Sequence, residues 1–154
     1  MKNPNCRSNE SGQGLAVVII LILLLGGGAW LLYSHKQGLD KEGRAFGHDV
    51  VNRVVLNYDQ AFLANYLSAQ AKLDLPPSDQ IALMNQLRLL GQPVQPLQVD
   101  ENMTWESNFF APRGFFTAHL SYPSGPGTLQ IAIDHPVSKW QVVNLSFAGP
   151  STAR

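Results

Sequence analysis

The most apolar stretch of the chain is LAVVIILILLLGGGAWLLY, residues 15–33, and no charged residue occurs between positions 11 and 34. As a helix, this stretch would span roughly 28 Å, close to the thickness of the hydrocarbon core of a bilayer. It begins at Leu15 and ends with Trp30 and Tyr33, whose amphipathic rings favour the headgroup region. The pattern predicts a membrane-anchoring helix, in which the triple glycine at 26–28 is tolerated but has no evident role.

Three interpretations of this segment differ in how it is processed. A cleaved signal peptide would have a shorter apolar core followed by a small-residue site, whereas the glycine cluster here lies inside the apolar run. A type IV prepilin would carry glutamate at the fifth mature position, where Ile19 stands if cleavage follows Gly14. No cysteine follows the run, which argues against a lipoprotein. We therefore expect an uncleaved, single-pass anchor.

The orientation of the anchor depends on its flanks. Their basic residues are two before the apolar run and three after it, which does not discriminate between the two sides. A short polar N-terminus typically stays in the cytoplasm. We therefore expect residues 1–14 to form a cytoplasmic tail at an inner (plasma) membrane, and the C-terminal domain to be periplasmic or extracellular.

Beyond the anchor, residues 34–40 are expected to form a short polar linker, and the apolar positions then follow a helical spacing. A first helix over 41–56 is predicted by five apolar residues that share one face: Phe46, Val50, Val51, Val54 and Val55. Residues 57–59 interrupt this pattern. Asp59 is a favourable N-cap for a second helix over 60–67.

A third helix is predicted over 79–90. Two prolines precede it, Ser78 is placed to cap it, and Gly91 follows it in the position of a C-terminal glycine. Beyond this point the period changes from 3.6 to 2. Alternating apolar and polar residues predict consecutive antiparallel hairpins over 97–106, 115–122, 128–134 and 139–147.

Helices followed by strands predict an α+β domain over residues 41–147, with about three helices packed on one face of a curved antiparallel sheet of about four strands. A polar tail, 148–154, is expected to be flexible. This order resembles the nuclear transport factor 2-like superfamily, the cystatin-like cone, and in particular its small bacterial families with an exported or anchored domain. The matching stretches are NYDQAFLANYLS (57–68), PSDQIALMNQLRLLG (77–91) and SKWQVVNLSF (138–147).

The resemblance implies a fold more than an activity, because the superfamily includes isomerases, dehydratases, cyclases and non-catalytic binding modules. Its enzymes commonly place an Asp or His, often with a Tyr, inside the cone. The corresponding pocket candidates here are His119, Asp134, Tyr58 and Tyr66. His119 shares strand parity with polar neighbours, which favours a solvated position, and Asp134 precedes a His-Pro turn. The two tyrosines are predicted to be core aromatics with an accessible hydroxyl.

Composition narrows the function further. The chain has 154 residues with 11 basic and 11 acidic side chains, so it lacks the excess of positive charge that nucleic-acid binding requires. The single cysteine, Cys6, cannot form an internal disulfide and is expected to be an unreactive thiol. No spacing of ligands predicts a metal site, no motif predicts a nucleophile or a phosphate loop, and no cofactor is expected.

An aromatic group near the predicted hairpins is denser than a core requires. We interpret it either as sheet packing with a loop or as a contact surface for a partner, with Arg113 at its rim. The candidate interface residues are Trp105, Phe109, Phe110, Arg113 and Phe115.

These observations favour a non-catalytic, membrane-tethered binding or assembly module of the bacterial envelope. Its expected contacts are membrane lipid through the anchor and either an envelope protein or a second copy of the chain. Two alternatives stay open. One is a small-molecule-binding protein or proton-transfer enzyme using the cone pocket, which needs His119 and Asp134 to face one cavity. The other is a minor pilin-like component.

Overall fold

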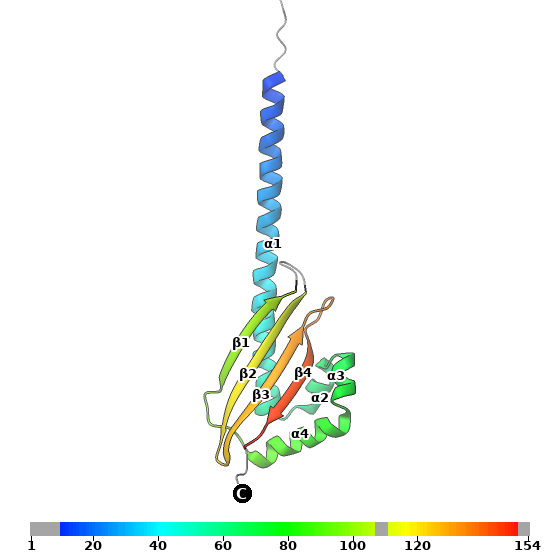
Figure 1. Cartoon of the computed structure of the whole chain (residues 1–154), viewed down its shortest axis with the longest axis vertical. Coiled ribbons are helices and arrows are strands. Elements are labelled where there is room, and N and C mark those ends of the chain that lie inside the picture. Colours follow the sequence, from blue (N-terminus) through cyan, green and yellow to red (C-terminus); the bar gives the residue numbers. More distant parts are fainter. Residues whose placement is uncertain (1–9, 107–110, 151–154) are drawn as a thin grey trace, which may run out of the picture. The chain divides into compact units, whose positions relative to one another are not determined.

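The computed structural model of the chain describes residues 10–106 and 111–150. The chain divides into two compact units, residues 1–37 and 38–154. The first helix, α1, runs from Glu10 to Val55 and contributes to both units. The second unit also contains three shorter helices and a four-stranded sheet (Figure 1). The predicted α+β class with a single long apolar helix is confirmed.

Helix α1 contains the whole apolar segment and continues without a break through the triple glycine at 26–28. Leu15, Trp30 and Tyr33 are all exposed. In the part of the chain that the structure describes, α1 is the one helix long and apolar enough to cross a membrane.

The segment 34–40, which we expected to be a short polar linker, is helical within α1, and the division between the two units falls inside it. The segment contains no proline, and its one glycine, Gly38, costs a helix only about 1 kcal/mol relative to alanine. Its Lys, Gln and Leu residues are good helix formers. Polarity alone therefore does not end a helix here.

Three short helices follow, and their ends are set by local hydrogen bonds. Helix α2 spans Gln60–Tyr66, and the side chain of Asp59 accepts a hydrogen bond of 2.9 Å from the backbone N–H of Phe62, as predicted for an N-cap. Helix α3, Ala69–Asp74, was not predicted. Ser68 begins it by accepting a hydrogen bond of 3.1 Å from the backbone N–H of Ala71.

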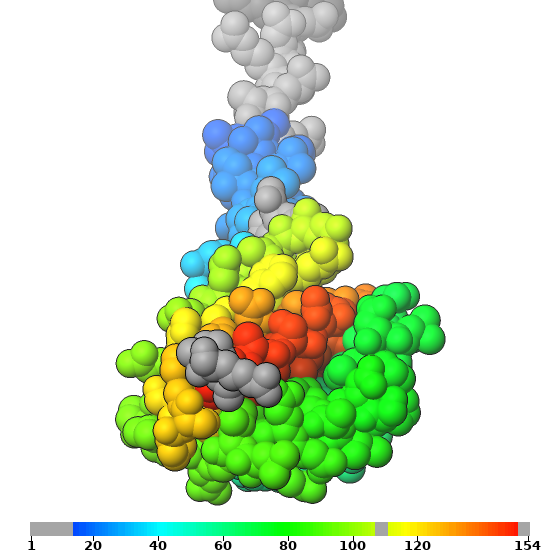
Figure 2. Space-filling model, turned by 60° about the horizontal axis from the view of Figure 1, so that its bottom comes forward, coloured from blue at the N-terminus to red at the C-terminus, as the bar shows by residue number. Residues whose placement is uncertain are grey.

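Helix α4 spans Pro77–Leu90 and starts two residues earlier than predicted. Pro76 occupies the N-cap position without a side-chain hydrogen bond, so the expected cap by Ser78 was wrong. The reason is that proline suits the first helical turn, where its missing N–H would have had no partner. Gly91 ends the helix with a φ of 80°, a conformation that favours glycine. Figure 2 shows the green surface of α3 and α4 bordering the orange-red surface of the last strand.

The sheet is an antiparallel meander in the order β1-β2-β3-β4. Its strands are β1 (Gln98–Trp105), β2 (Pro112–Tyr122), β3 (Gly125–Asp134) and β4 (Gln141–Ala148). The predicted strands are confirmed, although the second and third each begin three residues earlier than expected and the fourth begins two residues later. The last strand includes Ala148, which we had assigned to the tail, and residues 151–154 of that tail lie outside the described residues.

The core lies between one face of this sheet and the helices of the second unit. Its largest fully buried side chains include Phe116, Leu63 and Met84. On α1, Gly43 and Gly47 occupy consecutive turns of the buried face. A Cβ atom at Gly47 would lie 2.2 Å from the ring of Phe116, and one at Gly43 would lie 2.7 Å from the ring of Trp140. The two glycines thus allow the helix to approach the sheet closely.

Candidate functional site

The face of the sheet that points away from the core is polar and open. Strand register places its residues in rows across the sheet, one of which is Asn102, Phe115, Ala132 and Asn144. The next row consists of Asp100, Thr117, Gln130 and Ser146. We call these two rows the open face. Because neighbouring rows on one face lie two residues apart along each strand, their side chains form one continuous surface.

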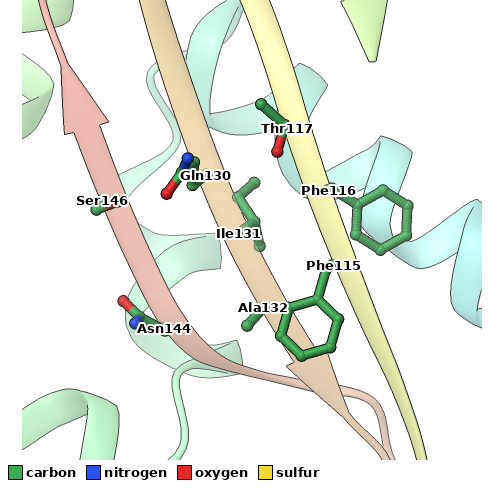
Figure 3. A pocket seen from close by; sticks show the side chains of 8 residues that line it. All are labelled: Phe115, Phe116, Thr117, Gln130, Ile131, Ala132, Asn144 and Ser146. Carbon is green, nitrogen blue, oxygen red and sulfur yellow. The ribbon is translucent and has the colours of Figure 1, made fainter. Parts of the chain in front are cut away.

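The middle of the open face holds a shallow groove of about 300 Å³. Figure 3 shows the side chains that line it, with the ring of Phe115 beside Ala132, its cross-strand partner. Phe115 is 48% exposed. None of the eight lining residues is charged. An aromatic side chain among small and amide-bearing residues is a composition suited to contact with another surface, because interface centres are depleted of charge and enriched in aromatics.

His119 and Asp134, the candidate proton-transfer pair, are not brought together. His119 pairs with Thr128 across the sheet, whereas Asp134 pairs with Arg113, six positions away along β2. That separation corresponds to about 20 Å. His119 is exposed, as its strand parity predicted, and its Nε2 lies 3.0 Å from a carboxylate oxygen of Asp100. The geometry required by the enzyme alternative is therefore absent for this pair.

Asp134 lies at the opposite end of the sheet. One of its carboxylate oxygens is buried and has no hydrogen-bond partner within the described ranges. It lines a small hollow of about 170 Å³ together with Glu106, Arg113 and His135. Arg113 is held by Glu106, at 3.3 Å between nitrogen and oxygen.

Tyr58 and Tyr66 occupy different environments. Tyr58 is a half-buried junction residue between α1 and α2 with a φ of 52°, and the guanidinium of Arg88 lies 5.9 Å from its ring centre. Tyr66 is 40% exposed, and its ring centre lies 4.5 Å from that of Phe62 and 5.3 Å from that of Phe46. The prediction of a core aromatic is thus only partly right for Tyr66, which also lines a groove with Lys139 and Trp140.

The candidate interface residues are only partly grouped. Trp105 is tied to α1, because its indole Nε1–H donates a hydrogen bond of 2.9 Å to Asp40. Arg113 and Phe115 both lie on the outer side of β2. Phe109 and Phe110 fall outside the described residues, as does Cys6. Of the predicted interface residues, Phe115 is the one that belongs to the open face as defined above.

Two features of the described residues bear on possible chemistry. Among them, no three His, Cys, Asp or Glu side chains are grouped so that they could hold a metal ion. Burial raises the pKa of the Tyr122 hydroxyl to about 12, and the nearby Tyr58 adds to this effect. The hydroxyl of Tyr122 is buried and has no hydrogen-bond partner in the described part of the chain. A neutral, buried phenol of this kind is typical of packing.

The contacts that hold α1 to the sheet were not predicted from the sequence. Glu101 of β1 accepts a hydrogen bond from Arg44, and its other carboxylate oxygen lies 3.1 Å from Nε2 of His48. Arg44 and His48 lie one turn apart on α1. The pattern Gly-x-x-x-Gly at 43–47 was the available signal. It marks a helix face that permits close approach, although it does not identify the partner.

Comparison with family models, curated proteins and solved structures gives no match for this chain. The class of protein is therefore assigned from its fold and its candidate site alone. It is an α+β domain with a four-stranded antiparallel meander, following a helix that is long and apolar enough to cross a membrane. The resemblance to the nuclear transport factor 2-like superfamily stays a prediction.

Proposed function

We propose that this protein is a membrane-tethered, non-catalytic binding or assembly module of the bacterial envelope, and that the open face is its contact surface. The observation that carries the proposal is the uncharged groove around Phe115, on the side of the sheet that the helices leave uncovered. The anchor would hold the domain at an inner membrane, and the partner would be an envelope protein or a second copy of the chain.

The separation of His119 from Asp134 supports a binding role over proton transfer, because a general acid–base pair must reach one substrate. The exposure of Leu15, Trp30 and Tyr33 supports a lipid contact for the apolar part of α1. The order of helices and strands also supports membership of the nuclear transport factor 2-like superfamily. We place the C-terminal domain in the periplasm or cell exterior because the N-terminal flank is short.

Site-specific photo-cross-linking in intact cells tests the contact surface. A photoreactive residue at Gln130, on the open face, is expected to give discrete covalent adducts with one partner or with a second copy. The matched control is the same residue at Asn85, which is exposed on α4. The charged substitution Phe115→Asp should abolish the adducts without unfolding the domain, since that side chain is half exposed. Equal adducts from both positions, or none from Gln130, would contradict the proposal.

Topology requires its own measurement. A reporter enzyme that is active only outside the cytoplasm, fused after Arg154, is expected to be active. Mass measurement of the purified full chain should show residues 15–33 still present. A mature N-terminus beginning after Gly14 would instead support the pilin-like alternative.

A further inference from the structure

A second groove lies at the junction of α1, α2 and the segment that leads into β4. Its volume is about 580 Å³, within the size range of small-molecule sites. It shares no lining residue with the open face. The residues that line it are Phe46, Asn65, Tyr66, Leu67, Lys139, Trp140 and Gln141.

The walls of this groove are aromatic and held in place by packing. Phe46 and Tyr66 approach each other with ring centres 5.3 Å apart and a tilt of 52°. Trp140 is only 8% exposed, and its ring is packed so closely against Gly43 that the helix has no room for a Cβ there. Because these side chains come from three separate elements and are already packed, the groove is formed before any ligand enters.

The polar lining residues determine which charge the groove favours. Lys139 is the one charged residue among them, and its ammonium group can only donate hydrogen bonds. Within the described ranges, it makes no ion pair. Asn65 and Gln141 carry amides that can donate as well as accept. Aromatic rings alone would also accept a cation, but an ammonium group at the same groove repels one.

We propose that this groove binds a small organic anion with a flat apolar body, which lies against Phe46, Tyr66 and Trp140 and directs its charged group towards Lys139. The apolar body would gain from contact with the aromatic walls, and the anion would be matched by the one cationic group of the lining. This inference is independent of the proposed contact surface, because the two sites have different residues.

The three tryptophans of the chain allow a sharp test in the full-length protein in detergent. Trp140 lines the groove, Trp105 donates a hydrogen bond to Asp40 and is not a lining residue, and Trp30 lies in the apolar part of α1. After labelling with fluorotryptophan, the three fluorine resonances are assigned by single Trp→Phe substitutions. Naphthoate is then titrated to a few millimolar. We expect a saturable shift of the Trp140 resonance, while Trp105 stays unchanged and Trp30 reports any partitioning into the micelle.

Probes that share the naphthalene ring but differ in charge, together with lysine variants, separate recognition of the charge from nonspecific hydrophobic binding. Naphthylmethanol and naphthylmethylammonium are expected to bind several-fold more weakly than naphthoate. Lys139→Gln should weaken naphthoate binding about threefold to fivefold, the effect of one exposed charge pair. Lys72→Gln, on the exposed surface of α3, is the control and should leave binding unchanged.

Four results would overturn the proposal. They are no shift at Trp140, a shift that follows Trp30 without saturating, ammonium binding as tight as that of naphthoate, or an unchanged affinity in Lys139→Gln. Both lysine side chains are exposed, so neither substitution should destabilise the domain. Unfolding temperatures equal to that of the unsubstituted protein will show that the variants are folded. If Gln130 gives no cross-links while naphthoate still binds at Trp140, the assembly proposal fails and this one stands.

Discussion

The close approach of α1 to the sheet at Gly47 makes a quantitative prediction. In Gly47→Ala, the new Cβ would lie 2.2, 2.3 and 2.5 Å from three atoms of the Phe116 ring. Ordinary van der Waals contact begins at 3.4 Å, so ring or helix would have to move by about 1 Å. Phe116 is 1% exposed, so its ring is held among core side chains. Overpacking of this kind costs about 1–3 kcal/mol.

Alanine also stabilises a helix relative to glycine, by about 1 kcal/mol, and this gain must be separated from the steric cost. Gly38→Ala provides the separation. Gly38 lies in the same helix, and a Cβ there meets nothing within 4 Å. The variant Gly38→Ala should therefore show only the gain in helix propensity. We expect Gly47→Ala to lower the free energy of unfolding by up to about 2 kcal/mol and Gly38→Ala to raise it by up to about 1 kcal/mol.

The assay is thermal unfolding of the full-length protein in detergent, followed by near-ultraviolet circular dichroism. The two variants differ by the steric cost alone, about 1–3 kcal/mol. At roughly 3–5 °C per kcal/mol for a domain of this size, their midpoints should differ by about 3–15 °C. A second-site substitution, Phe116→Leu, should recover part of the loss in a Gly47→Ala background, because the two side chains compete for one space. Equal midpoints for the two alanine variants would refute the reasoning.

Three further predictions concern other parts of the chain. Asp59→Ala should cost about 1 kcal/mol in urea unfolding through loss of the α2 cap, whereas Asp59→Asn should keep the cap and lose only the contact with Arg53, at 3.5 Å. The pKa of Tyr122 is about 12 in the folded state and about 10 when unfolded. Its contribution to the free energy of unfolding is therefore complete below about pH 10 and is lost as the pH rises towards 12. Tyr122→Phe should therefore flatten the decline of the urea midpoint in that window. Replacing Gly26–28 by leucine should leave the yield of Gln130 adducts unchanged, if the anchor acts only as a tether.

Features encoded by local patterns could be predicted from the sequence. The apolar length of residues 15–33 predicted the helix, and the change of period after Gly91 predicted the strands. Asp59 was identified as a cap from its residue type and position, and the structure confirms it. The parity of His119 within its strand correctly placed it on the polar side. Each of these inferences depends on neighbours within a few residues.

Features that depend on distant contacts could not be predicted. The use of Gly47 becomes evident only when Phe116, far along the chain, is packed against it. Similarly, Asp134 and His119 both belong to the hairpins, yet only the register shows that they lie at opposite ends of the sheet. The groove lined by Lys139 draws its residues from three elements. The spacing of residues along the sequence does not show which distant residues become neighbours in the fold.

The proposed contact surface and the apolar helix are physically complementary. The open face offers one exposed aromatic, Phe115, among Thr, Ser, Asn and Gln, so the apolar area available for association is small. Such a face binds weakly in free solution, and the absence of charged residues from the lining of its groove gives little electrostatic steering at that point. A membrane tether compensates for this, because confinement beside a partner raises the effective concentration without adding any contact. A weakly binding, polar face on an anchored domain thus combines solubility with association at the membrane.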